Sequence, residues 1–482
     1  MAQSIKSNYI FNLINTFSSL LFQLISFPYV SRVLLPDGVG HIDFYQSIIQ
    51  YVILLSSLGI PMYAIREIAR VRSDEILRNK TALEILLLHL VLTVFGYFAV
   101  FVMSVSVAEI MQDLTLFLIL SLSIVFSTIG CEWFYKGIED FKYITIRGVA
   151  IRLMSIVLLF AFVREKDDLY YYACLLVLGT VGNNLLNFIR LRKYVRISKD
   201  IFIDFRPIRH FHPILRIFAL NLIISIYVQL NTVMLGFMSD DKAVGLFSSA
   251  SRLTHFLLTF GNALGTAMLP RMSNLISENK MEQFSILANK SMSYMVAISL
   301  PLTIGLAIIA PVLIVVFCGQ SFQPASTTLQ ILSPIVVMIS MSNVLGIQIL
   351  YPLGKEKLVI LCTGLGALVN LFFNIVLIPI FDYNGAAVAT TIAEIAVTVS
   401  MLLIGRKYFT INFLNRSYVC YIVGSLLMGI LLYLIMQTSN NSLLSFAFAV
   451  TIGALVYGIS LLVMKESLAV ELITTIMNKY KK

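Results

Sequence analysis

The chain has 482 residues, of which 59% are hydrophobic and only 12% are charged, and its formal net charge is +10. Soluble domains carry about 25% charged residues. A chain with half that share cannot cover a water-facing surface, so the composition excludes a soluble protein and predicts an integral membrane protein. The five cysteines follow no CxxC or Cys/His spacing. We therefore expect no disulfide framework, no metal site and no cofactor.

Fourteen apolar runs of about 18–25 residues follow one another along the chain, each long enough for a membrane-spanning helix. The first run begins at Tyr9 and is too long for the core of a signal peptide, so we expect it to be retained as a span. The predicted spans are 10–31, 44–65, 81–106, 114–134, 143–163, 171–190, 217–238, 246–269, 291–315, 326–350, 358–379, 386–404, 417–436 and 443–464.

The basic residues predict the topology of these spans. If the N-terminus is cytoplasmic, most of the 35 Lys and Arg lie in inner segments, and the largest group lies in residues 190–216. The opposite orientation would reverse this bias, so the positive-inside rule favours both termini in the cytoplasm. The positive net charge is then explained by an anionic lipid leaflet, and we expect no nucleic-acid partner.

Two short matches indicate an internal duplication. LLPDGVGHIDFYQSI aligns with MSDDKAVGLFSSASRL and pairs Gly40 with Gly245, while YKGIEDFKY aligns with YPLGKEKL and pairs Gly137 with Gly354. Both matches carry span n onto span n+6, which is the plan of a transporter with a site between two lobes. The predicted divisions are an N-lobe of spans 1–6 with a basic linker (1–216), a C-lobe of spans 7–12 (217–405), and two added spans with a tail (406–482).

The eighth predicted span has a polar face. It carries Arg252, whose charge would cost about 2.5–3.5 kcal/mol at the centre of a single spanning helix. Polar residues at spacings of three and four lie on one face about 27 Å long. Hydrogen bonding between helices, worth about 0.6 kcal/mol per bond, is the alternative, but a face with Arg and His favours a water-filled cavity. Its members are Ser248, Arg252, His255, Thr259, Asn262 and Thr266.

Similar polar faces occur on the first, second and seventh spans. The duplication makes the seventh span the counterpart of the first and the eighth the counterpart of the second. Symmetry mates with polar faces are expected to line one cavity between the lobes. The residues are Asn8, Asn12, Asn15, Ser19, Gln23 and Ser26 in the first span, Ser47, Gln50 and Ser57 in the second, and Asn221, Ser225, Gln229 and Thr232 in the seventh.

Other charged residues inside the predicted spans leave alternatives open. Glu394 in the twelfth span is either a protonated packing residue or a site for a coupling ion. Arg152 in the fifth span either lines the cavity or pairs with Glu84 or Glu132, and we prefer the pairing. Arg32, at the outer end of the first span, either extends toward the interface or faces the cavity.

Motifs for catalysis are absent from the sequence. It contains no GxxxxGK[ST], HExxH or GxSxG pattern, and no pair of carboxylates on a folded domain outside the membrane. We therefore expect a transporter that is not an enzyme, powered by a gradient or by substrate flux.

Four segments carry a resemblance to a known family. They are ISFPYVSRVLLPDGVGHIDFYQSI (25–48), SSLGIPMYAIREIAR (56–70), CEWFYKGIEDFKYITIR (131–147) and FDYNGAAVATTIAE (381–394). The chain resembles the bacterial flippases of O-antigen and capsule repeat units, within the multidrug/oligosaccharidyl-lipid/polysaccharide exporter superfamily, over essentially its full length. The resemblance implies an all-α polytopic membrane protein with 14 transmembrane helices. Two six-helix lobes would form a V-shaped cavity beside two extra C-terminal helices, and the protein would work by alternating access in the bacterial inner membrane.

The resemblance also implies a substrate, an undecaprenyl-diphosphate-linked oligosaccharide that moves from the cytoplasmic to the outer leaflet. Related lipid II flippases have cavity arginines in the first, second and eighth helices; Arg32 and Arg252 match the first and eighth, whereas the second has only Arg66 at its inner end. The arginine fork suits diphosphate oxygens, so we expect Arg252 and Arg32 to bind them and His255 or Glu394 to provide coupling. The residues expected to bind the glycan are Asn12, Asn15, Ser19, Gln23, Gln50, Asn221, Ser225, Gln229, Thr232, Ser248, Thr259 and Asn262.

The expected partners are this lipid-linked oligosaccharide, membrane lipid, a polysaccharide polymerase and a chain-length regulator.

One alternative function is that of a drug/cation antiporter of the same superfamily. Such antiporters have twelve spans and luminal carboxylates, whereas here spans 1, 2, 7 and 8 have no acid beyond Asp43. A second alternative is a membrane glycan polymerase or ligase. Those enzymes need a large outer loop, but the longest loop here is basic and faces inward.

Overall fold

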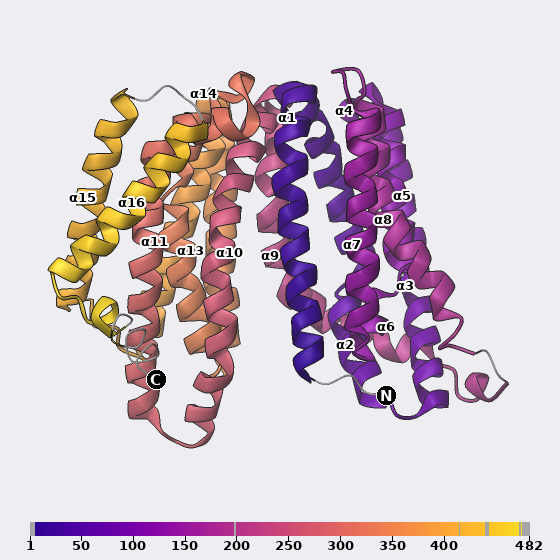
Figure 1. The fold of residues 1–482 in the computed structure, drawn as a ribbon. Helices are drawn as coiled ribbons and strands as arrows, with labels where there is room; N and C mark the ends of the chain where they lie inside the picture. Colours follow the sequence, from indigo (N-terminus) through magenta and orange to yellow (C-terminus); the bar gives the residue numbers. More distant parts are fainter. Residues whose placement is uncertain (1–4, 197–198, 414, 439–442, 472–473, 475–482) are drawn as a thin grey trace. The chain divides into compact units, whose positions relative to one another are not determined.

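The computed structural model describes the backbone of residues 5–196, 199–413, 415–438, 443–471 and 474. It describes the side chains of all of these except 5–6, 199–200, 216, 219–228, 260–267, 438 and 443. In the described part of the chain every regular element is a helix (Figure 1). The prediction of an all-α fold is therefore confirmed.

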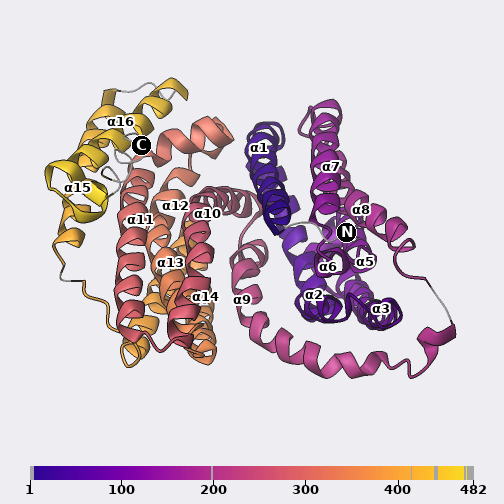
Figure 2. The ribbon, with the colours of Figure 1, turned by 60° about the horizontal axis from the view of Figure 1, so that its bottom comes forward.

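The chain forms two compact units, Met1–Phe237 and Met238–Lys482. In unit 1, helices α3, α5 and α8 pack in sequence, and α7 packs between α8 and α1 (Figure 2). The elements of unit 1 are α1 (Ile5–Ser57), α2 (Ile60–Val71), α3 (Glu75–Ser106), α4 (Ala108–Gln112), α5 (Leu114–Ile129), α6 (Glu132–Gly137), α7 (Phe141–Phe162), α8 (Leu169–Leu191), η1 (Lys199–Phe202), η2 (Pro207–His210) and α9 (Phe211–Met238), whose last residue falls in unit 2.

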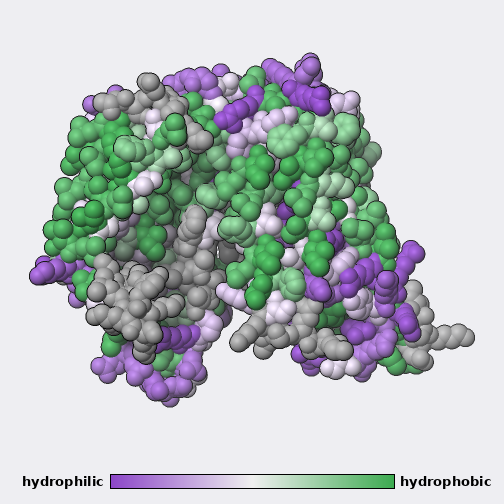
Figure 3. Space-filling model, in the orientation of Figure 1, coloured by the Kyte–Doolittle hydropathy of each residue, from purple (hydrophilic) through white to green (hydrophobic). Residues whose placement is uncertain are grey.

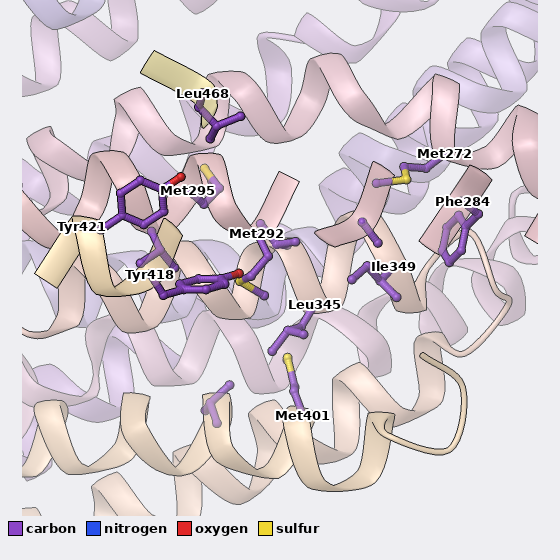
Figure 4. Close-up of a cluster of buried hydrophobic side chains, with 14 of the residues drawn as sticks. Met272, Phe284, Met292, Met295, Leu345, Ile349, Met401, Tyr418, Tyr421 and Leu468 are labelled. Atoms are coloured by element: carbon purple, nitrogen blue, oxygen red, sulfur yellow. The ribbon is translucent and has the colours of Figure 1, made fainter. Parts of the chain in front are cut away.

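Unit 2 is built around α11, which packs against α10, α12, α13 and α15. Figure 4 shows the centre of this unit, where Met292 and Met295 of α11 lie among side chains from other elements. Leu345 and Met401 are two of these neighbours. The elements of unit 2 are α10 (Asp241–Ser277), α11 (Met281–Cys318), η3 (Gln320–Phe322), α12 (Ala325–Leu332), α13 (Ile335–Asn343), η4 (Val344–Leu350), α14 (Glu356–Gly405), α15 (Arg416–Thr438) and α16 (Leu443–Val463).

Ten helices in the described part of the chain are long and apolar enough to cross a membrane. Two of them are each a pair of helices joined at one non-helical residue. The break in α1 is at Leu35 (φ 62°, ψ 175°), directly before Pro36, and the break in α14 is at Asp382 (φ 54°, ψ −135°). Proline removes a backbone donor and clashes with the preceding turn, so the break before Pro36 follows from the sequence.

The surfaces of these helices are apolar. On α3, for example, Val94, Phe95, Phe98 and Phe101 are each more than 60% exposed. Figure 3 shows such side chains over the middle of the helices, while hydrophilic side chains gather at the helix ends. A soluble protein rarely exposes a large contiguous apolar patch. The chain is therefore a polytopic membrane protein.

Aspartates cap the N-termini of four helices. Asp74 accepts a hydrogen bond from Leu77 N at the start of α3 (2.9 Å), and Asp113 accepts one from Leu116 N at the start of α5 (3.0 Å). Asp140 and Asp240 do the same for α7 and α10. A capping carboxylate satisfies a backbone donor that has no partner inside the helix. The acidic turns of the sequence are thus the places where helices begin.

The second predicted span is not one helix to its end. Residues 44–65 carry no charged side chain, but α1 ends at Ser57 and α2 begins at Ile60. Leu58 and Gly59 between them have φ angles of 44° and 82°, and Pro61 lies in the first turn of α2. Proline is favoured in the first turn of a helix and unfavourable inside one. The sequence Gly59-Ile60-Pro61 is thus the signal for this break.

Candidate functional site

The polar face predicted for the eighth span lies on α10. In the helix, Leu253 and Leu258 are buried in unit 2, whereas Arg252 and His255 are exposed. Ser248, nearer the start of α10, is buried and its hydroxyl donates to the carbonyl of Gly245 (3.4 Å). Arg252 and His255 therefore lie on an exposed side of α10, and other side chains of this helix are buried in unit 2.

The rest of that face is described in part. The Thr259 hydroxyl donates to the backbone carbonyl of His255 (3.3 Å), so its hydrogen bond is made within α10. The side chains of Asn262 and Thr266 lie outside the described residues. The assignment of this face to glycan and diphosphate binding stays a prediction.

The polar face predicted for the first span lies on the first half of α1. Asn12 and Gln23 are exposed, and Asn15 and Ser19 are half-buried. Gln50, on the second half of α1, is also exposed. Some residues of this polar face are therefore exposed, and others, such as Asn15, pack against a neighbouring helix.

Arg32 lies close to the break in α1. Its side chain is exposed, and its Nη1 donates to the carbonyl oxygen of Pro28 (2.6 Å). This bond holds the guanidinium along its own helix, near the end where the chain turns at Leu35.

The remaining predicted residues are on α9 and α14. Gln229 and Thr232 are half-buried, whereas the side chains of Asn221 and Ser225 lie outside the described residues. Glu394 is buried, with 7% of its surface exposed. The α1 and α9 residues belong to unit 1, and the α10 residues and Glu394 belong to unit 2. Their joint role as one site therefore stays a prediction.

The preferred pairing of Arg152 with Glu84 or Glu132 is wrong. On α7, Arg152 Nη1 donates to Asn15 Oδ1 (3.0 Å) and to Ser18 Oγ (2.7 Å) of α1, and it also lies 3.4 Å from the carbonyl oxygen of Asn15. Among the described residues it forms no ion pair with Glu84 or Glu132, the partners that we preferred. Both carboxylates are occupied by other cations, which the helical periodicity of α7 alone does not reveal.

Glu132 is shared by two cations. Its Oε1 lies 2.8 Å from Lys136 Nζ, and its Oε2 lies 3.5 Å from Arg147 Nη2. Arg147 is 6% exposed, and its guanidinium also donates to the side-chain oxygens of Asn183 (3.0 Å) and Asn187 on α8. A buried cation with a carboxylate and two amides is well compensated, so Arg147 stabilises the packing of α7 on α8.

Glu84 is fully buried and binds the segment that leads into α9. Its Oε1 accepts from the backbone N–H of Arg206 (2.8 Å), and its Oε2 accepts from the side chains of Arg209 and His210. His210 Nδ1 lies 2.7 Å from the hydroxyl of Tyr63. A neutral imidazole satisfies both contacts, because Nδ1 accepts from Tyr63 and Nε2–H donates to Glu84.

Burial lowers the pKa of His210 below its ordinary value of 6.5, against the opposing effect of the Glu84 carboxylate. The Arg209 guanidinium weakens that opposing effect because it binds the same oxygen. Burial and the neighbouring guanidinium both favour the neutral imidazole in the folded chain.

No group of three or more His, Cys, Asp or Glu is placed to hold a metal ion in the part of the chain that the structure describes. Most of the predicted binding residues carry amides, hydroxyls or guanidinium groups. Such groups bind oxyanions and sugar hydroxyls by hydrogen bonds.

Comparisons with known proteins agree with this chemistry. The family model for polysaccharide biosynthesis proteins matches residues 5–276, and the MatE model matches residues 217–376. A protein of Escherichia coli (strain K12) named “Putative O-antigen transporter” is 26% identical over 423 residues, which are 86% of this chain and 99% of that protein.

Two solved structures show the same fold. The lipid II flippase MurJ in an inward closed conformation matches with a TM-score of 0.67 and 17% identity over 96% of this chain and 100% of its own. A multidrug resistance MATE transporter in an inward-facing conformation matches with a TM-score of 0.63 and 15% identity over 83% of this chain and 97% of its own.

The fold is that of the MurJ and MATE membrane transporters. Because one family model covers more than half of the residues, the chain belongs to the polysaccharide biosynthesis protein family. The matches confirm the resemblance inferred from the sequence, a polysaccharide flippase of the multidrug/oligosaccharidyl-lipid/polysaccharide exporter superfamily. The relatives are named as transporters and flippases, which confirms that the chain is not an enzyme.

Proposed function

We propose that this chain moves undecaprenyl-diphosphate-linked oligosaccharide repeat units from the cytoplasmic to the outer leaflet, for the synthesis of O-antigen, capsule or exopolysaccharide. The observation that carries the proposal is the match along 99% of a relative named as an O-antigen transporter. The fold shared with a lipid II flippase supports it. That length of match favours this function over drug/cation antiport.

The proposed topology has fourteen spans in the bacterial inner membrane, with both termini cytoplasmic. Ten spanning helices support it, since α1 and α14 are each two helices. The 28-residue α9 and the 37-residue α10 supply two more long helices. The basic residues of segment 190–216 support the cytoplasmic side. We also propose the lobe divisions 1–216, 217–405 and 406–482, from the duplication.

The proposed binding roles follow from the chemistry of the two helix faces. Arg252 and Arg32 would bind the diphosphate, because a guanidinium offers paired donors to phosphate oxygens. The amides and hydroxyls predicted in the sequence, such as those of Asn12 and Gln23, would bind the glycan. The exposure of Arg252, Arg32, Asn12 and Gln23 supports their access to a ligand.

Coupling is proposed for His255 or Glu394. An imidazole exchanges protons near neutral pH, and a buried carboxylate can bind a proton or a cation. Alternating access would expose these groups to the two sides in turn. A polysaccharide polymerase and a chain-length regulator are the proposed neighbours, since they act on repeat units in the outer leaflet.

Glycan export in a bacterial strain that lacks its own flippase tests the proposal. We expect the wild-type chain to restore export, Arg252→Ala to abolish it, and Arg252→Lys to restore it partly, because lysine keeps the charge without the planar fork. The matched control is Lys242→Ala, which removes an exposed cation from the first turn of α10. Wild-type export by both Arg252 variants at normal protein levels would contradict the role of Arg252.

A further inference from the structure

Around Glu132, unit 1 has more cations than one carboxylate neutralises. Arg147, Arg152 and Lys136 lie near a single acid, Glu132. Lys136 and Arg147 form ion pairs with that carboxylate, at 2.8 and 3.5 Å. Arg152 does not, within the described residues. An uncompensated cation among membrane-spanning helices is costly, and such residues mark functional sites.

The hydrogen bonds of Arg152 occupy only one of its nitrogens. Nη1 makes all three contacts with Asn15 and Ser18 of α1. Nε and Nη2 form no hydrogen bond to any described residue, and neither is among the buried polar atoms that lack a partner. The side chain is half-buried. Two donors of one guanidinium are therefore left for a ligand, and they lie in the geometry that binds an oxyanion through two oxygens.

The surroundings hold the guanidinium in one position. The Ser18 hydroxyl donates to the carbonyl of Asn15 (2.9 Å) while its oxygen accepts from Arg152. Gly148, one turn before Arg152, leaves room beside them, since a Cβ there would come within 3.1 Å of Asn15 Oδ1 and 3.4 Å of Arg152 Nη1. A fixed and partly desolvated cation binds an anion more strongly than a mobile one.

We propose that Arg152, held by Asn15 and Ser18, is a second cationic site in unit 1 that binds the diphosphate of the lipid-linked substrate. The inference rests on the proposed function, because that function supplies the anion. A diphosphate fits this cluster better than a single carboxylate does. It has more oxygens to accept hydrogen bonds and more negative charge to balance the excess positive charge. The neighbouring polar-face residues Asn12 and Ser19 then lie on the same helix as the two residues that hold Arg152.

Binding of farnesyl diphosphate to the purified full-length chain tests this site. The protein is placed in nanodiscs of phosphatidylcholine, so that no anionic lipid competes. We expect Arg152→Gln to weaken binding roughly tenfold, the loss typical of one charge-assisted contact. The control is Lys142→Gln, which removes an exposed cation from the first turn of the same helix and is expected to bind as the wild type does.

A second variant separates binding from a purely structural role. Asn15→Asp is nearly isosteric, leaves Arg152 in place, and puts a carboxylate where the amide oxygen now accepts from Nη1. If Arg152 binds the diphosphate, the new carboxylate neutralises it, and affinity falls about tenfold while thermal stability is kept. If Arg152 only links α1 to α7, the ion pair preserves that link and binding is unchanged, which overturns the proposal. Asn15→Asp also decides the matter if Arg152→Gln does not fold.

Two further arms keep this inference separate from the proposed function. In the first, glucuronate replaces farnesyl diphosphate and tests whether the site binds an acidic sugar. If the chain binds glucuronate through Arg152 but does not bind farnesyl diphosphate, the proposal is contradicted. A wild-type chain that restores glycan export but binds no farnesyl diphosphate also overturns this site and leaves the proposed function standing. A wild-type chain that does not restore export overturns the proposed function instead.

Discussion

Glu84 and His210 are 126 residues apart in the chain, yet Glu84 Oε2 lies 2.9 Å from His210 Nε2. The carboxylate comes from the first turns of α3, and the imidazole ends η2, directly before α9. Tyr63 of α2 bonds to the other imidazole nitrogen. Three separate segments of unit 1 are therefore joined by one buried network, which anchors the start of the long helix α9.

Loss of the Glu84 carboxylate is expected to destabilise unit 1. Glu84→Ala leaves His210 and the backbone N–H of Arg206 without their acceptor, and loss of one partner from a buried charged network costs about 2–3 kcal/mol. We expect a lower thermal unfolding temperature in detergent. The control is Glu139→Ala, because Glu139 pairs with Arg72 at 2.6 Å on the exposed surface, where a pair is worth about 0–1 kcal/mol. Equal losses in both variants would contradict the account.

Acid is expected to weaken the same network. The folded-state pKa of His210 lies below 6.5, so below that pH the unfolded chain takes up a proton that the folded chain does not. The contribution to stability is full above about pH 6.5 and falls as the pH drops, by at most about 1.4 kcal/mol per pH unit.

Thermal unfolding at about pH 7.5 and 5.5 measures this effect. We expect His210→Gln to lose less stability on acidification than the wild type, because glutamine does not titrate. His212→Gln, which changes an exposed histidine in the next turn, is expected to behave as the wild type does. A wild-type chain that becomes more stable at the lower pH would show that the carboxylate of Glu84 raises the pKa of His210 instead.

Gly385 is expected to be essential for the turn inside α14. It is buried three residues after the break at Asp382, and a Cβ there would overlap the backbone carbonyl of Leu377. A backbone atom cannot move aside as a flexible side chain does, so Gly385→Ala is expected to cost about 1–3 kcal/mol. Gly458→Ala is the control, since a Cβ at Gly458 in α16 meets nothing within 4 Å. Equal protein levels and unfolding temperatures for the two variants would contradict this prediction.

The spanning helices could be predicted because they depend on local properties, namely apolar length and periodicity. The break between the eleventh and twelfth predicted spans falls in the sequence FDYNG, and the structure has Asp382 in the left-handed region there. The side-chain oxygen of Asn384 accepts from Thr328 in α12 (2.9 Å). A motif that suggested a family thus also has a structural role, to close a helical hairpin against its neighbour.

The proposed duplication aligns two glycines that have different roles in the structure. Gly137 and Gly354 align in the sequence, yet a Cβ at Gly137 would lie 2.7 Å from Ile68, whereas Gly354 has a φ of 69° and open space around it. The first glycine permits close packing, and the second permits a left-handed turn. Sequence alignment does not distinguish these two uses of glycine.

The partners of the intramembrane charges could not be predicted. Helical spacing places Arg152 on a face of α7, but its contacts depend on how α1 packs there, and that packing brings Asn15 and Ser18 to it. Arg147 is the arginine of α7 that pairs with Glu132. It lies on a different face of α7 from Arg152, beside Asn183 and Asn187 of α8. Tertiary packing decides which of several nearby cations reaches a carboxylate.

The most direct test of the central claim measures movement between leaflets. The purified chain is reconstituted into vesicles with undecaprenyl-diphosphate-linked oligosaccharide, and the glycan exposed on the outside is counted over time with a membrane-impermeant lectin. We predict that the wild-type chain makes glycan from the inner leaflet accessible, that Lys242→Ala does so at the same rate, and that Arg252→Ala does not. Equal accessibility in vesicles with the wild-type chain and in vesicles without protein would contradict the account.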